Sequence, residues 1–120
     1  MQPDLLHARE NLRNKLFHNA EIVIEEILNS KLDNLLEIGI FGSLAKDKFT
    51  CESDTDIYLL FDNNIPDRQL KGHLRSIAEE NNCDIVFLTK NSLTSIDAGL
   101  LVNNILENRI TLWRKEYDTK

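Results

Sequence analysis

Runs of apolar residues alternate with helix-like stretches along the chain. Four short runs have apolar side chains at most successive positions and predict β-strands, the last of them an edge strand: residues 35–41, 57–61, 83–88 and 110–113. In the first run, Leu36, Ile38 and Ile40 alternate, so we expect them to share one face of a sheet. Gly39 leaves room for another group to approach the opposite face closely.

Outside these runs, apolar residues recur at the spacing of a helix with one buried face. The first 32 residues predict a helical segment, either one long helix or two helices that meet near His18 and Asn19. Three more helices are predicted, the second with Pro66 in its first turn: residues 44–48, 66–80 and about 94–108. The charged residues 114–120 predict a frayed tail. Alternating strands and helices are typical of an α/β layer fold.

The bulk composition favours an ordinary soluble domain. The chain has 120 residues, of which 42% are hydrophobic, and this suits one domain with one core. No apolar run approaches the roughly 18 residues of a membrane span. The first residues lack the basic and apolar regions of a signal peptide, so we expect a cytoplasmic protein without a membrane partner. Cys51 and Cys83 show no Cys-x-x-Cys spacing and are expected to be free thiols.

The net charge of the chain indicates which kinds of partner it can bind. The formal net charge is −6, which disfavours direct, non-specific binding to nucleic acid. An acidic chain suits a basic partner protein, or a small anionic substrate if metal ions neutralise the site. Acidity that serves only solubility is the alternative interpretation.

Two aspartates are the first candidates for chemistry. Asp54 and Asp56 stand two positions apart at the start of the apolar run 57–61, and side chains at such positions share one face of an extended chain. A pair of carboxylates on one face is a good ligand set for hard divalent cations. Taken alone, the pair is better explained as an ordinary turn before a strand.

A second motif changes that balance. Gly42-Ser43 follows the first apolar run, and Asp54 comes twelve residues after Gly42. Gly42-Ser43 followed by Ser53-Asp54-Thr55-Asp56 resembles the signature of the polymerase-beta-like nucleotidyltransferases. The small size makes the chain similar to the minimal nucleotidyltransferases, which are antitoxin partners of HEPN-domain ribonuclease toxins. The resemblance extends from Leu35 to Trp113.

The resemblance implies a fold and a domain plan. It predicts a small mixed β-sheet with helices mainly on one face. Residues 1–120 would form a single minimal nucleotidyltransferase domain, with a helical segment at 1–32 and a catalytic core at 35–113. A chain of this size leaves no room for a further acceptor-binding domain, so the acceptor would come from another polypeptide or from a homo-oligomer.

The resemblance also implies a metal site. Asp54 and Asp56 would hold two Mg²⁺ ions, with Mn²⁺ as an alternative. Asp84, at the start of the run 83–88, would be the third carboxylate, ligating one metal and helping to deprotonate the attacking hydroxyl. Asp62 is not expected to be a metal ligand. It lies at the other end of the run 57–61, and a strand rises roughly 3.3 Å per residue, so Asp62 would be too far away to share the metals of Asp54 and Asp56.

Four further residues are nucleotide-binding candidates. Gly42 and Ser43 would hold the triphosphate of ATP. Lys46 stands where the family usually carries arginine, and it would either contact phosphate or face solvent. Ser53 would bond a phosphate or cap a turn. Asp47 replaces the family's usual glycine, which brings the conformation of this loop into question.

The expected activity is transfer of AMP from ATP to a partner protein. By resemblance, the partner is a HEPN toxin in a hetero-oligomer, and the acceptor is a tyrosine hydroxyl. Two alternatives stay open: a non-catalytic module that neutralises a toxin by binding it, and adenylylation of a small molecule in an oligomer-built pocket.

Overall fold

Four strands form one mixed sheet. The computed structural model describes residues 5–91, 105 and 107–115. The sheet order is β3-β2-β1-β4, with β1 at Leu35–Phe41, β2 at Thr55–Phe61, β3 at Cys83–Thr89 and β4 at Ile110–Arg114. β2 and β3 are parallel, whereas β1 pairs antiparallel with both β2 and β4. The predicted mixed sheet is confirmed, but Arg114 belongs to the edge strand β4 and not to a tail.

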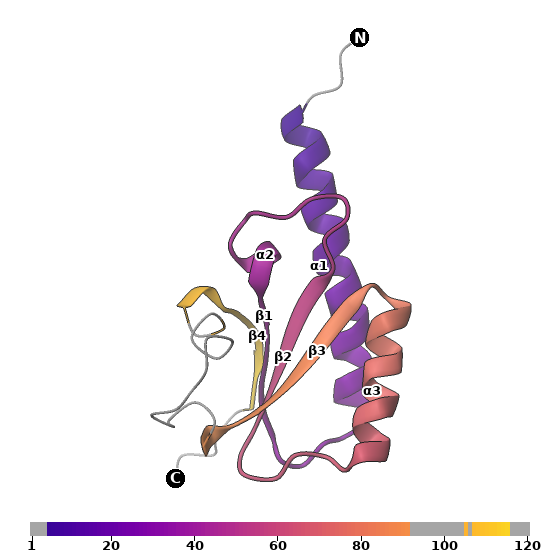
Figure 1. The fold of residues 1–120 in the computed structure, drawn as a ribbon, viewed down its shortest axis with the longest axis vertical. Coiled ribbons are helices and arrows are strands. Elements are labelled where there is room, and N and C mark those ends of the chain that lie inside the picture. The colour runs from indigo at the N-terminus through magenta and orange to yellow at the C-terminus, as the bar shows by residue number, and fades with distance from the viewer. Residues whose placement is uncertain (1–4, 92–104, 106, 116–120) are drawn as a thin grey trace.

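Two helices cover one face of this sheet (Figure 1). α1, Leu5–Asn29, is one continuous helix, so the prediction of a single long helix is confirmed and a break at His18 is wrong. α3, Arg68–Glu80, connects the parallel strands β2 and β3. The main core lies between these helices and the sheet, and its fully buried members include Val23, Ile27, Ile38, Ile57 and Leu74.

Two helix boundaries differ from the prediction. α2 is a single turn at Gly42–Ala45, where the sequence favoured residues 44–48. It ends early because Asp47 has a positive φ of 58°, a conformation that terminates a helix. α3 begins only at Arg68, since Asp67 is its N-cap and accepts a 2.8 Å hydrogen bond from the Leu70 amide. Pro66 therefore precedes the helix and is not in its first turn.

The predicted alternation in β1 is wrong at one residue. Ile38 and Ile40 face α1, but Leu36 is buried on the opposite face of the sheet. A bulge-like register shift between Leu35 and Glu37 causes this, because an extra residue in one strand reverses its alternation.

A smaller apolar cluster lies on the face that α1 and α3 leave uncovered. It contains Phe41, Tyr58, Leu60 and Leu88, and Ile105 is fully buried against it. Most of the final helix predicted for residues 94–108 lies outside the described residues. Among the described residues, no helix is long and apolar enough to cross a membrane.

Candidate active site

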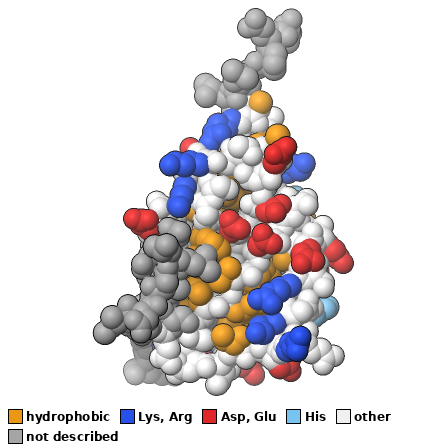
Figure 2. All heavy atoms as spheres, viewed as in Figure 1, with side chains coloured by type: hydrophobic (Ala, Val, Ile, Leu, Met, Phe, Trp, Pro, Cys, Tyr) orange, Lys and Arg blue, Asp and Glu red, His pale blue; other side chains and the backbone are white. Residues whose placement is uncertain are grey.

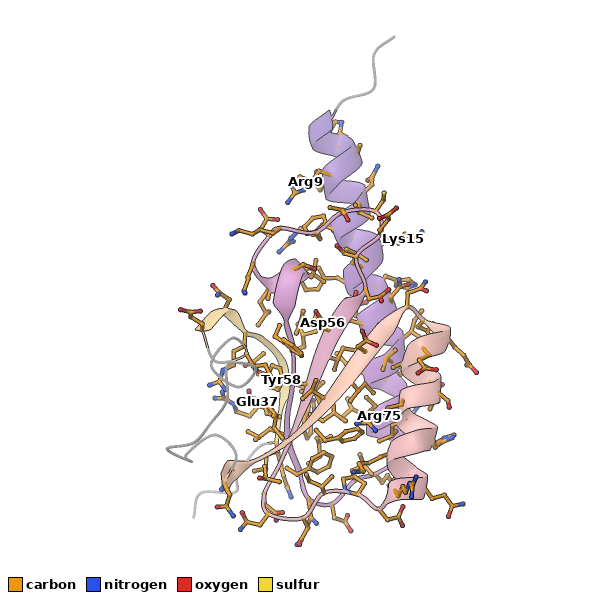
Figure 3. All side chains as sticks on the ribbon, viewed as in Figure 1. Arg9, Lys15, Glu37, Asp56, Tyr58 and Arg75 are labelled. Atoms are coloured by element: carbon orange, nitrogen blue, oxygen red, sulfur yellow. The ribbon has the colours of Figure 1, made fainter. Side chains whose placement is uncertain are left out.

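Strand pairing brings the separated candidate motifs to one end of the sheet. Phe41, the last residue of β1, pairs with Asp56 in β2. Asp56 in turn pairs with Asp84 in the parallel strand β3. Figure 3 shows Asp56 at this end of β2, next to α2. Gly42, Asp56 and Asp84 therefore lie side by side across three strands, and Asp54 precedes β2 at the same end.

Gly42 is packed directly against the aspartate pair. Its φ is +74°, in the left-handed region that favours glycine. A Cβ added to Gly42 would overlap the carboxylate of Asp56 and lie 3.1 Å from its Cγ. Only glycine fits here, because any side chain would collide with Asp56 or change the backbone. The Gly-Ser turn and the Asp-x-Asp motif are thus one structural unit.

Two neighbouring carboxylates disfavour the charged form of Asp56. Burial, followed by the charges of Asp84 and Asp54, raises the pKa of Asp56 to about 6. Acidic side chains gather on this face of the molecule around the ends of β2 and β3 (Figure 2). A concentration of negative charge of this kind is suited to bind cations.

The donor set fits a hard divalent ion. Asp54, Asp56 and Asp84 offer only carboxylate oxygens, which Mg²⁺ and Mn²⁺ prefer. Within the described parts of the chain, however, no group of three or more acidic, histidine or cysteine side chains stands already arranged as a metal site. The strand register brings these residues to one place, and metal binding itself is taken up under Proposed function.

Asp62 lies at the opposite end of β2 from Asp56, as expected. Its Oδ1 accepts hydrogen bonds from the amides of Asn63 and, at 3.0 Å, Asn64. Asp62 therefore closes a turn and takes no part in the aspartate cluster.

Lys46, Ser53 and Asp47 lie on the segment that joins the two motifs. The Lys46 amide donates to the Gly42 carbonyl at 3.0 Å and closes the single turn of α2. Ser53 Oγ accepts a 2.8 Å hydrogen bond from the Thr50 amide, which is the turn-capping role. Asp47 takes the left-handed conformation that glycine favours, and aspartate tolerates it better than most residues do. The replacement of glycine is therefore compatible with this loop.

Both cysteines are free thiols, as expected. Cys51 is exposed and Cys83 is buried beside Asp84. Burial, and then the charges of Asp54 and Asp84, raise the pKa of Cys83 to about 12. The Cys83 thiol is therefore neutral and a poor nucleophile at neutral pH.

The sequence analysis did not single out Glu37, which is 4% exposed in β1. Its carboxylate accepts hydrogen bonds from Tyr58 Oη at 2.5 Å and from Arg114 Nη2 at 3.0 Å, and Arg109 lies 3.7 Å away. A lone charged residue inside an apolar strand was the available signal. The group that approaches Gly39 closely, as predicted, is the ring of Tyr58. Its hydroxyl occupies the space that a Cβ on residue 39 would need.

Burial, taken by itself, would raise the pKa of Glu37. The hydrogen bonds from Tyr58 and Arg114, together with the charges of Arg109 and Arg114, outweigh burial and hold the pKa below its ordinary value. This carboxylate is therefore ionised and fully paired, unlike the aspartate cluster.

Comparisons with known proteins identify the family to which this fold belongs. Residues 22–117 match the family described as polymerase beta, nucleotidyltransferase. The chain belongs to this family. Comparison with curated proteins gives no match.

Solved structures show the same fold at low identity. A candidate nucleotidyltransferase from Sulfolobus solfataricus is 20% identical with a TM-score of 0.59, over 89% of this chain and 87% of that one. A toxin–antitoxin complex with AMP-PNP contains a chain that is 20% identical with a TM-score of 0.55, over 78% and 73% of the two chains. A mutant MntA–HpeT toxin–antitoxin complex contains one that is 19% identical with a TM-score of 0.54, over 78% and 72%.

Proposed function

We propose that this protein is a metal-dependent nucleotidyltransferase that moves AMP from ATP to a partner protein. One observation carries the proposal: Gly42 is packed against Asp56, and Asp56 pairs with Asp84 across parallel strands. The Gly42-Ser43 turn and three aspartates thus meet at one end of the sheet. Family membership supports the same reaction class.

The three aspartates would have different roles in this reaction. Asp54 and Asp56 would hold two Mg²⁺ ions and Asp84 would ligate one of them, with Mn²⁺ as a substitute. When bound, the ions supply positive charge to the α-phosphate, the attacking hydroxyl and the leaving pyrophosphate. Asp84 also accepts the proton of the attacking hydroxyl as the new oxygen–phosphorus bond forms and pyrophosphate leaves.

Gly42 and Ser43 would contact the triphosphate of ATP. The positive φ of Gly42 keeps side-chain atoms away from the turn, so backbone can approach a phosphate closely. Ser43 adds a hydroxyl donor. Lys46 and Ser53 are the remaining phosphate contacts, Lys46 as a point charge and Ser53 through its hydroxyl proton, because its oxygen already accepts from Thr50.

The proposed acceptor is a tyrosine of a HEPN-type toxin in a hetero-oligomer. In support, two structures that share this fold are toxin–antitoxin complexes, one of them with AMP-PNP. A transferred AMP adds a negatively charged phosphodiester to the acceptor tyrosine. Placed near an RNase site, that charge would repel RNA and silence the toxin.

The second candidate function is a binding module that neutralises a toxin without catalysis. The acidic surface around the ends of β2 and β3 favours it, because such a surface complements a basic partner (Figure 2). Asp56→Asn separates the two candidates. It abolishes protection by an enzyme, whereas a binding module retains protection.

The direct test is transfer of a labelled nucleotide. We would incubate the protein with Mg²⁺, ATP labelled at the α-phosphate, and its co-purified partner, beside Asp54→Asn/Asp56→Asn and, as a matched acidic control, Glu52→Gln. Label on the partner that is lost only in the double variant is the expected result. A stable partner complex that never becomes labelled would favour the binding module.

A further inference from the structure

The loop between the two halves of the signature is held from outside the sheet. α1 extends beyond the end of the sheet that carries α2, and Arg9 lies on this extension, facing the loop (Figures 1 and 3). Arg9 Nη2 donates to the Asp47 carbonyl at 2.5 Å, and Nη1 donates to the Phe49 carbonyl at 3.4 Å. The Arg9 guanidinium also lies 4.2 Å from the centroid of the Phe49 ring.

This loop connects directly to the candidate ligands at both of its ends. The Lys48 amide donates to the Ser43 carbonyl at 2.8 Å, which ties the loop to the phosphate-binding turn. Phe49 is 2% exposed and belongs to the main core. After Phe49, the capped turn Thr50–Ser53 leads straight to Asp54. A shift of the loop would therefore move Ser43 and Asp54 together.

Arg9 fixes the loop mainly through its hydrogen bonds to backbone carbonyls, and not through its ion pair with Asp47. The Arg9 and Asp47 side chains are 45% and 71% exposed and lie 3.4 Å apart, so their ion pair contributes little. The hydrogen bonds from a charged donor to two carbonyls are stronger, and stacking on a buried ring adds to them. A lysine cannot reproduce this arrangement, because it lacks the planar fork of donors.

We propose that Arg9 is a positioning residue, which fixes the loop at 47–49 and through it the nucleotide-binding geometry of Ser43 and Asp54. The inference rests on the proposed function for its kinetic consequence, but its structural consequence can be measured without activity. Arg9 acts from α1, outside the catalytic core expected from the sequence.

Arg13 provides a matched control. It lies one turn further along α1, and its guanidinium is 4.7 Å from the centroid of the Phe17 ring, so this contact stays within the helix. Arg9→Ala and Arg13→Ala remove the same charge and the same kind of ring contact. Only Arg9→Ala releases the loop carbonyls.

The experiment combines hydrogen exchange with kinetics on the full chain and its partner. In Arg9→Ala and Arg9→Lys we expect loop amides 47–53 to exchange about tenfold faster, with α3 unchanged. We expect the KM for Mg·ATP to rise about tenfold. A loss of folded protein alone would lower kcat and leave KM unchanged.

Two results would overturn the inference: loop exchange in Arg9→Ala equal to wild type, or an equal rise of KM in Arg13→Ala. If wild type transfers no nucleotide, the proposed function fails, and loop exchange alone then decides the role of Arg9.

Discussion

The carboxyl groups of Glu37 and Asp56 have pKa values shifted in opposite directions, although both side chains lie on the same face of the sheet. Glu37 is almost fully buried, yet its pKa lies below the ordinary value, because Tyr58, Arg114 and Arg109 outweigh the effect of burial. Asp56 is only half-buried, yet its pKa is raised to about 6 by burial and by two neighbouring aspartates. Tyr58 links the two places, since it bonds Glu37 and stands two residues from Asp56.

The difference separates a carboxylate that the protein pairs internally from one that we propose binds cations. Glu37 has all its partners within the protein, so it fixes β4 to β1 and needs nothing more. Among the described residues, no lysine or arginine forms an ion pair with Asp56, and its two aspartate neighbours disfavour its charged form. Negative charges that repel one another beside a glycine turn are typical of a ligand-binding site.

The largest expected effect comes from removing the paired carboxylate. Glu37→Ala should destabilise the fold by about 3 kcal/mol, since Tyr58 loses its acceptor and two arginines lose their partner. Urea unfolding measures this value. The exposed Glu52→Ala should change stability by less than about 0.5 kcal/mol, and a similar small effect for Glu37→Ala would show that the network contributes nothing.

Removing the unpaired carboxylate should have the opposite sign. Asp56→Asn relieves repulsion with Asp54 and Asp84, so we expect the metal-free protein to gain about 1–2 kcal/mol, allowing for partial exposure. Thermal unfolding with a chelator present tests this. A lower Tm in the variant would mean that Asp56 is held by favourable contacts and is structural after all.

The two carboxylates should also respond to pH in different ranges. Asp56 has a raised folded-state pKa, so its contribution is present below its unfolded-state pKa and is lost as pH rises through about 6. Glu37 has a lowered pKa, so its contribution is lost only as pH falls through that lowered value. From neutral pH to about pH 5, wild type should therefore gain roughly 1 kcal/mol relative to Asp56→Asn. Parallel stability curves for the two proteins would contradict this.

The smallest effect concerns the loop between the motifs. Asp47 has a φ of 58°, so Asp47→Gly should relieve backbone strain and Asp47→Ala should not. We expect Asp47→Gly to be about 1 kcal/mol more stable than Asp47→Ala in chemical unfolding. Both variants lose the carboxylate, so the difference isolates the backbone. Equal stabilities would mean that the positive φ is not maintained.

Local patterns were enough to predict most of the individual strands and helices. The apolar run that became β1 has the predicted bounds, and the aspartate spacing correctly placed Asp54 and Asp56 at the end of β2 that faces α2. The placement of Asp84 beside Asp56 and the mixed sheet came from the family resemblance, because periodicity alone does not choose strand order.

The missed features depend on contacts between distant residues. The bulge that turns Leu36 away from Ile38 arises from pairing with β2 and leaves no signal in β1 alone. The partners of Glu37 lie in β2, in β4 and just before β4, and Arg9 contacts a loop 38 residues later. Sequence spacing identifies which side chains are chemically apt, whereas tertiary packing decides which of them are neutralised.

The central claim is that Asp54, Asp56 and Asp84 bind catalytic cations. The most direct test is calorimetric titration of Mn²⁺ into the protein saturated with a non-hydrolysable ATP analogue, beside Asp54→Asn/Asp56→Asn and Glu52→Gln. The account predicts about two ions per chain in wild type and in Glu52→Gln, and weak or no binding in the double variant. Equal Mn²⁺ binding by wild type and the double variant would contradict it.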